Sequence, residues 1–405
     1  MNTTKQWGLT PTLLLGGLLI ATSGPRPPDV PFRIQMIDGG ASETAAVADI
    51  NHDGRLDILS GEYWYEAPAW TRHRFRDLEF TAQYIDDFSD LIVDVDGDGF
   101  PDVVSVSWFA KRIAWWHNPG RAGGAKSWPD ATIHAGFNVE FAVLADVDND
   151  GKAREIVAQE NGTGQAWYEV QNGRWVAHVI SDKSYGHGIG VGDVNKDGRN
   201  DILTPRGWLE SPADPRSAGW TFHPDWEAVN VTAPPAGGGA PKMTDLGFMH
   251  VADVNGDGRN DVVAAAGHDY GVFWFEQGTA GKWTRHVIDE AWSQGHASTL
   301  ADLNQDGRPD LVTGKRFMAH NGRDPGEREP LGVYWYEYLP GSGGALEWVR
   351  HIVDVGGRVG GGMQIPVVDI DGDGDQDLVC AGKSGLFLVE NLTKGRPVKA
   401  AISGR

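Results

Sequence analysis

The sequence has little cysteine, no clustered positive charge and none of the common catalytic motifs. Cys380 is the one cysteine among 405 residues, so the chain has no internal disulfide. Its place after Val379 in a strand-like run favours a buried, inert thiol. The formal net charge is -21 and no basic patch is visible, which disfavours nucleic-acid binding. No Ser-His-Asp elbow, phosphate loop, dinucleotide fingerprint or zinc-ligand spacing occurs, so the common classes of enzyme are not indicated.

The first residues read as an export signal. Lys5 supplies a positive charge, Leu13 to Ile20 an apolar core, and Ala21 to Ser23 a small-residue cleavage site. A membrane anchor is the alternative, but this apolar run is too short to span a bilayer. We therefore expect residues 1–23 to be a cleaved signal peptide and 24–31 a linker. The mature protein is then secreted or periplasmic, with no membrane attachment.

A loop of the form Asp-x-Asn/Asp-x-Asp-Gly-x-x-Asp recurs along the chain, and Asp253 to Asp261 is a clear copy. Oxygen ligands at the first, third, fifth and ninth positions encircle one point, and the glycine permits a sharp turn, as in sites for Ca²⁺. The predicted ligands, loop by loop, are Asp49, Asn51, Asp53 and Asp57; Asp94, Asp96, Asp98 and Asp102; Asp146, Asp148 and Asp150; Asp193, Asn195, Asp197 and Asp201; Asp253, Asn255, Asp257 and Asp261; Asp302, Asn304, Asp306 and Asp310; and Asp369, Asp371, Asp373 and Asp377.

The third loop departs from this pattern, because Arg154 stands where the last Asp is expected and Glu155 follows it. Either the chain bulges to bring Glu155 in, or the site is weak or empty. We therefore expect five to seven Ca²⁺ ions. An EF-hand is the rival interpretation, but it needs a chelating Glu at the twelfth position, which no copy has. The loops are thus predicted to join strands.

The loop starts lie 45 to 67 residues apart, a period typical of a propeller or solenoid. An aromatic strand such as Trp274-Phe275-Glu276 follows each loop, and a strand with Trp, two residues and His, such as Trp283 to His286, follows in most repeats. Four short strands in each of seven repeats predict an all-β, seven-bladed β-propeller over residues 32–395, with a C-terminal tail at 396–405. The last repeat lacks its fourth strand, and Phe32 to Asp38 resembles one. We expect this N-terminal strand to close the ring.

These loops, set between small apolar strands, resemble FG-GAP or VCBS repeats and the repeats of integrin α-subunit propellers. The resemblance covers nearly all of the mature chain and implies a propeller that binds Ca²⁺. The added aromatic and Trp-x-x-His strands look like secreted bacterial members. They are more distantly similar to the propeller of aldos-2-ulose dehydratase, and ulvan-type polysaccharide lyases are propellers of this size. The same fold serves adhesion, scaffolding and catalysis, so the resemblance implies no particular activity.

The face opposite the loops carries the candidate functional residues. Glu43, Glu140, His187 and His296 each stand six residues before a loop, where equivalent positions ring the mouth of the central channel. The turns between second and third strands add further groups to that face, namely Arg206, His268, Lys315, Arg316 and Lys383. We expect a solvent-lined rim there. The histidines of the Trp-x-x-His strands repeat with the blades, so they are predicted to belong to the framework.

Two insertions interrupt the period, Lys315 to Pro330 and Pro224 to Asp245, and both are predicted on the channel-mouth face. The first holds Lys315, Arg316, His320 and Arg323, a candidate anion clamp. Two functions stay open. One is a carbohydrate lyase or dehydratase acting by β-elimination, with His187 or His296 as the base, Lys315 and Arg206 as the clamp, and Glu140 as an orienting or acid group. The other is a non-catalytic module that binds a glycan or protein on the same face.

Overall fold

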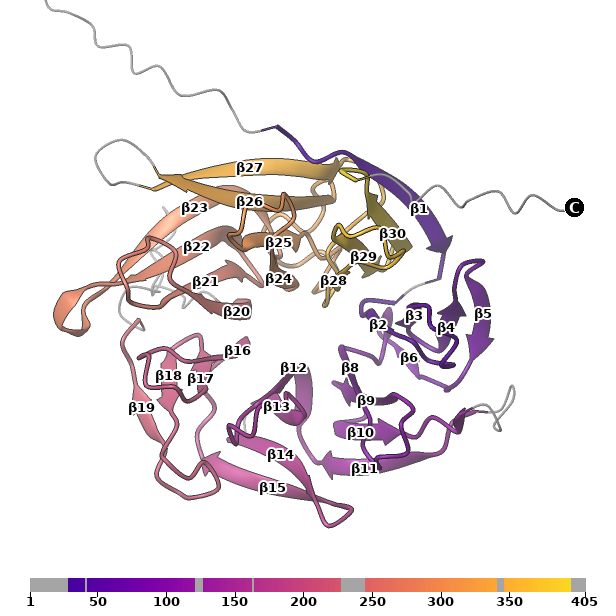
Figure 1. Cartoon of the computed structure of the whole chain (residues 1–405), viewed down its shortest axis with the longest axis horizontal. Helices are drawn as coiled ribbons and strands as arrows, with labels where there is room; N and C mark the ends of the chain where they lie inside the picture. Colours follow the sequence, from indigo (N-terminus) through magenta and orange to yellow (C-terminus); the bar gives the residue numbers. More distant parts are fainter. Residues whose placement is uncertain are drawn as a thin grey trace, which may run out of the picture.

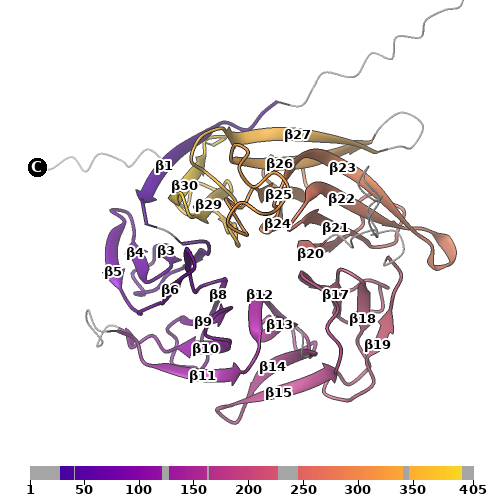
Figure 2. The same cartoon turned by 180° about the vertical axis from the view of Figure 1, so that it is seen from behind.

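The computed structural model describes residues 28–40, 42–120, 127–161, 164–226, 245–340 and 346–394, whose strands stand in a ring around a central axis (Figures 1 and 2). The predicted signal peptide, the tail at 396–405 and most of the Pro224 to Asp245 insertion lie outside these residues. Within them, no helix is long and apolar enough to cross a membrane.

The strands follow the predicted order of four per repeat. The first three blades comprise β2 (Ala46–Ala48), β3 (Asp57–Ser60), β4 (Tyr63–Glu66) and β5 (Thr71–Arg74); β8 (Ser89–Val93), β9 (Asp102–Ser107), β10 (Arg112–Trp116) and β11 (Asp130–Ala135); and β12 (Asn138–Ala145), β13 (Glu155–Asn161), β14 (Gln165–Gln171) and β15 (Arg174–Ser181). The next two comprise β16 (Ile189–Gly192), β17 (Asp201–Thr204), β18 (Gly207–Glu210) and β19 (Thr221–His223), then β20 (Leu246–Ala252), β21 (Asp261–Ala266), β22 (Tyr270–Gln277) and β23 (Trp283–Ser293).

The remaining blades comprise β24 (Ser298–Ala301), β25 (Asp310–Gly314), β26 (Gly332–Pro340) and β27 (Leu346–Val355), then β28 (Val367–Val368), β29 (Asp377–Gly382), β30 (Gly385–Asn391) and β1 (Phe32–Asp38). A small hairpin of β6 (Phe80–Thr81) and β7 (Tyr84–Ile85) joins the first two blades, and a short 3₁₀ turn, η2 (Thr279–Gly281), precedes β23.

Hydrogen bonding groups these strands into five four-stranded sheets, one eight-stranded sheet and the two-stranded hairpin. The eight-stranded sheet is two four-stranded meanders whose inner strands, β16 and β20, pair in parallel. Gly190 allows this contact, since a Cβ on it would lie 2.2 Å from the carbonyl oxygen of Met249. The described strands therefore make seven blades, and the all-β propeller predicted from the repeats is confirmed.

The N-terminal strand closes the ring, as predicted. β1 pairs antiparallel with β30, from Phe32 opposite Asn391 to Asp38 opposite Leu386. β1 is thus the outer strand of the blade that β28 to β30 begin (Figure 1). Arg33 forms an ion pair with Glu390 there, which replaces the histidine that this blade lacks.

Packing of the N-terminal segment begins earlier than the linker prediction of 24–31 implied. Asp29 Oδ1 lies 2.7 Å from Nδ1 of His351 on β27. Val30 is buried and packs in a core cluster with Leu303 and Val359. The described end of the predicted linker is therefore docked against the sixth and seventh blades rather than extended in solvent.

The outer-strand histidines hold each blade together. In five blades the histidine stacks on the tryptophan of the third strand, with ring centroids 3.8 to 4.4 Å apart. Its Nε2 contacts the glutamate two residues after that tryptophan, at 2.5 to 2.8 Å. In four blades that glutamate also accepts the side-chain amide of the loop's third residue, at 3.1 to 3.4 Å. These contacts give the histidines the framework role expected from their repetition.

Candidate functional site

The recurring loops fold as tight turns around their carboxylates. In the first loop, Asp49 accepts the backbone N–H groups of Asp53 and Gly54, both at 2.9 Å. Asp57, the ninth residue, is buried and accepts N–H groups from Ile50 at 3.1 Å and from Ala67 at 2.9 Å. The same bonds recur in other loops. The ninth residue thus joins its own loop to the residue at or just after the end of the third strand of the blade.

The third loop uses Glu155 in place of the missing Asp. Glu155 Oε2 accepts the N–H of Val147 at 3.0 Å, the bond that Asp57 makes with Ile50 in the first loop. Oxygens of Asp146, Asp148 and Glu155 lie within 4.8 Å of one another. Of the two alternatives for this loop, the geometry therefore favours the bulge that brings Glu155 in.

The donor set of the loops fits Ca²⁺. Oxygens of Asp94, Asp96 and Asp98 lie within 4.8 Å of one another, and all belong to hard carboxylates. Burial, with the neighbouring loop carboxylates, raises the pKa of Asp201 to about 7 and that of Asp310 to about 8. A divalent cation would add positive charge at the centre of each cluster of acids. Calcium binding nevertheless remains a prediction.

The channel-mouth residues Glu140 and His187 are in direct contact. His187 Nε2 lies 2.8 Å from Glu140 Oε2, and His187 Nδ1 donates to the Leu246 carbonyl at 3.1 Å. Burial opposes a charge on the imidazole, but the Glu140 carboxylate outweighs it and raises the pKa of His187. Burial would likewise raise the pKa of Glu140, yet His187 and Arg316 hold it well below its ordinary value.

Arg316 joins two carboxylates of this ring. Its Nη1 donates to Glu140 Oε1 at 2.6 Å, and its Nε and Nη2 donate to Glu43 at 2.9 and 3.1 Å. All three side chains are buried. Lys383 adds a second cation, with Nζ 3.8 Å from Glu43 Oε1. These contacts link the first, third, sixth and seventh blades at one end of the channel.

Three histidines gather beside Glu140. His268 Nε2 lies 3.1 Å from His187 Nε2, and the rings of His268 and His296 have centroids 4.7 Å apart. His296 is fully buried, and within the described structure neither of its ring nitrogens has a hydrogen-bond partner. Burial lowers the pKa of both His268 and His296.

The Lys315 to Pro330 insertion covers this cluster. Asp324 Oδ2 contacts the Nδ1 atoms of His268 and His320, each at 2.8 Å, and the two rings stack with centroids 4.2 Å apart. On its other side the insertion accepts hydrogen bonds from Tyr84 of β7, to the Ala319 carbonyl, and from Lys383, to the Met318 carbonyl at 2.8 Å. The insertion therefore bridges the fifth blade, the seventh blade and the β6–β7 hairpin.

The structure places Lys315 and Arg206 differently from the predicted clamp. Lys315 is buried, and its Nζ donates to Ser293 Oγ at 2.9 Å and to the Gly326 carbonyl at 2.6 Å. It fastens the base of the insertion instead of facing a ligand. Arg206 is exposed, and no described side-chain contact joins it to the cluster. Lys315 and His296 are both buried, so the expectation of a solvent-lined rim is wrong for these two residues. The cation that contacts Glu140 is Arg316.

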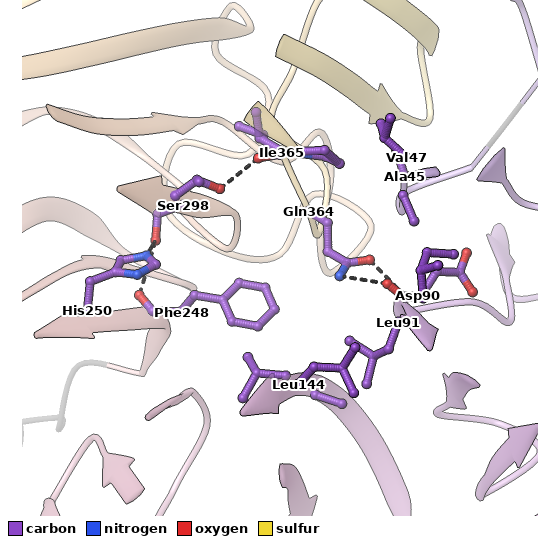
Figure 3. A pocket seen from close by; sticks show the side chains of 16 residues that line it. Ala45, Val47, Asp90, Leu91, Leu144, Phe248, His250, Ser298, Gln364 and Ile365 are labelled. Carbon is purple, nitrogen blue, oxygen red and sulfur yellow. Dashed lines mark hydrogen bonds between the residues drawn. The ribbon is translucent and has the colours of Figure 1, made fainter. Parts of the chain in front are cut away.

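Behind the cluster, the inner strands line an open cavity of about 390 Å³ along the channel (Figure 3). Its lining is mostly small and apolar, as at Leu91 and Leu144. His250 Nε2 lies 2.9 Å from Ser298 Oγ, which donates to the Phe248 carbonyl at 3.2 Å. Across the cavity, the Gln364 side chain bonds to the backbone of Asp90 at 2.8 and 3.2 Å. Burial lowers the pKa of His250 to about 4.

Comparison with known proteins agrees with this architecture. A model of the FG-GAP-like repeat matches residues 94–153 and 253–313, which begin at the first aspartates of the second and fifth loops. The chain is thus a β-propeller that contains FG-GAP-like repeats. No curated protein matches it.

Solved structures similar to the chain share its fold at low identity. A chain in the crystal structure of BBS1N in complex with ARL6DN, soaked with mercury, aligns with a TM-score of 0.53 and 9% identity, covering 91% of this chain and 97% of that chain. The same complex soaked with lead gives a TM-score of 0.51 and 10% identity over the same shares, 91% and 97%. A chain of rhamnogalacturonan lyase YesW aligns with a TM-score of 0.48 and 11% identity, covering 92% of this chain and 76% of that chain.

Proposed function

We propose that the protein is an exported, calcium-loaded propeller that binds a carbohydrate-type ligand at the channel mouth and acts on it as a lyase or dehydratase by β-elimination. The observation that supports this most is the contact cluster of Glu140, His187, His268 and His296. These residues come from the third to the sixth blades, and Glu140, His187 and His296 stand at or before the starts of inner strands, at the end away from the loops.

β-Elimination needs a base beside an acidic C–H and a positive environment for the resulting anion. The structure offers a more accessible base than His187 or His296, which were the first candidates. His320 has a side chain 45% exposed, and Asp324 holds its Nδ1 at 2.8 Å. That carboxylate fixes the proton on Nδ1, so Nε2 presents its lone pair. Arg316 and Lys383 supply the nearby positive charge.

The test is an assay of uronate-containing polysaccharides and keto-sugars with the full chain in Ca²⁺, read as new ultraviolet absorbance from a conjugated double bond. His320→Ala should lose about 100-fold or more in turnover, the usual contribution of a general base. His286→Ala is the matched control. It has a similar exposure, 39%, and a similar carboxylate partner, Glu276 at 2.7 Å, but it lies on an outer strand.

Equal loss of turnover in the two variants would show that the reaction does not take place at the channel mouth. If the wild-type chain binds these glycans when they are immobilised but never generates unsaturation, the protein is a binding module instead. Melting curves of both variants separate loss of chemistry from loss of fold.

A further inference from the structure

We infer that His187, His268 and His296 form a binding site for one divalent transition-metal ion at the channel mouth. One ring nitrogen from each of the three imidazoles lies within 4.8 Å of the other two. This inference rests on the same site as the proposed function and adds to it the Lewis acid that would hold the anion formed by elimination.

The contact between His187 and His268 has the geometry of a ligand pair. Each Nδ1 already faces an acceptor, the Leu246 carbonyl for His187 and the Asp324 carboxylate for His268. The Nε2 atoms of the two rings lie 3.1 Å apart, and His187 Nε2 also lies 2.8 Å from Glu140 Oε2, so two imidazole nitrogens and a carboxylate oxygen converge on one point. Two nitrogens that share a tetrahedral ion at about 2.0–2.1 Å lie about 3.3 Å apart. The observed spacing is therefore close to that of a ligand pair.

The same two acceptors are the outer partners that metal-bound histidines usually have. A ligating imidazole donates its second N–H to a carboxylate or a backbone carbonyl, which fixes the ring and its tautomer. Asp324 fills this role for His268 from the insertion, and the Leu246 carbonyl fills it for His187 from β20.

His296 supplies an independent observation. Its side chain is fully buried among described residues, yet both ring nitrogens lack a hydrogen-bond partner. Buried polar groups in native proteins are almost always bonded, and an exception calls for an explanation such as an ion. Glu140 Oε1 is 4.0 Å from His296 Nε2, so the carboxylate borders the ion site on the side where His187 contacts it.

The charges around the cluster favour a cation over an anion. The carboxylates of Glu43, Glu140 and Asp324 outnumber the cations Arg316 and Lys383. Three imidazoles suit Zn²⁺ and its neighbours in the first transition row, whereas Ca²⁺ takes oxygen ligands. This site therefore differs in chemistry from the oxygen-lined loops, and the two classes of ion can be measured separately.

The test is a titration of the full chain with Co²⁺ as the probe, in excess Ca²⁺ so that the loops do not compete. A nitrogen-rich tetrahedral site should give a strong visible absorption band that saturates at one equivalent and is displaced by Zn²⁺. His268→Ala should abolish the band. Asp324→Asn, which keeps all three ligands, should weaken Co²⁺ binding about 10- to 100-fold. The control variants His286→Ala, on an outer strand, and Glu329→Gln, in the same insertion, should leave the band unchanged.

No saturating band in the folded wild-type chain, or a band indifferent to both His268→Ala and Asp324→Asn, would overturn the inference. A band without turnover on any glycan or keto-sugar would support the ion site and refute the proposed lyase. Turnover with no band would do the reverse. Because Asp324→Asn removes only a charge, its affinity shift can be read even if His268→Ala fails to fold.

Discussion

His250 should make the stability of the protein fall on the acid side of neutrality. Its imidazole lines the channel cavity beside Ser298 and Phe248 (Figure 3), and burial lowers its pKa to about 4. In the unfolded chain the pKa returns to about 6.5. Between these values the unfolded state binds more protons than the folded state. The contribution is therefore complete above about pH 6.5 and is lost as the pH falls toward 4.

The size of the effect follows from the two pKa values. A shift from 6.5 to about 4 corresponds to about 2 kcal/mol of lost stability at pH 5, relative to pH 8. The cavity holds about 390 Å³ and His250 is only half-buried, so water can solvate the charged ring in part. We therefore expect the measured loss to lie between about 1 and 2 kcal/mol.

The assay is urea unfolding of wild type and His250→Gln at pH 8 and pH 5, in Ca²⁺. Glutamine keeps an N–H for Ser298 and removes the titration, so the stability gap between the two proteins should narrow by about 1–2 kcal/mol at pH 5. Gln364→Leu is the control, because it loses two bonds to the Asp90 backbone without changing a titratable group. If the difference in stability between wild type and His250→Gln is the same at both pH values, burial in the channel wall does not disfavour the charged form of His250.

Four further predictions concern the framework. Excess chelator should lower the melting temperature by about 10 °C or more, because each filled site adds about 2.7 kcal/mol of stability when free Ca²⁺ is 100-fold above its Kd. An unchanged melting curve would show that calcium does not stabilise the fold. Metal analysis should find the Glu155 loop occupied, giving seven ions. Deleting 29–38 should open an edge on β30 and cause aggregation, whereas deleting 24–28 should not; equal melting curves would contradict the closure. Arg76 is buried with Asp87 and Asp90, at 2.7 and 2.8 Å. Replacing it, as Arg76→Met, should lower the free energy of unfolding measured in urea by about 3–5 kcal/mol. A loss below about 1 kcal/mol would show that these ion pairs do not stabilise the fold.

The fold was predictable because the same pattern of loop and strands occurs seven times in the sequence. Loop spacing gave the number of blades, and the fourth-strand pattern identified Phe32 to Asp38 as the strand that completes the ring, which pairs with β30 as expected. For the third loop, which departs from the pattern, the sequence left two alternatives open. The third loop could be resolved only in three dimensions, because a one-residue bulge at Glu155 changes which carboxylate reaches Val147 without changing the composition.

The mouth was located from the sequence, but its internal contacts were not. Position relative to the loops correctly put Glu140, His187 and His296 together. It could not rank Lys315 against Arg316, which are adjacent in the chain and project to different partners: one to Ser293 and the insertion, the other to Glu43 and Glu140. Asp324 was missed because it lies in an insertion with no counterpart in other blades. The density of charge in that insertion was the available signal.

The two ends of the channel differ in how their residues repeat, and this difference carries the functional argument. At the loop end, one set of contacts from loop to glutamate to histidine recurs, so each copy stabilises its own blade. At the mouth, equivalent positions hold Glu43, Glu140, His187 and His296, which contact one another or a shared partner: Glu43 and Glu140 both accept from Arg316, and both histidines approach Glu140. A framework role would select the same residue at each position, as it does at the loops. Convergence of unlike residues on one buried point instead suits a site that holds one ion and one ligand.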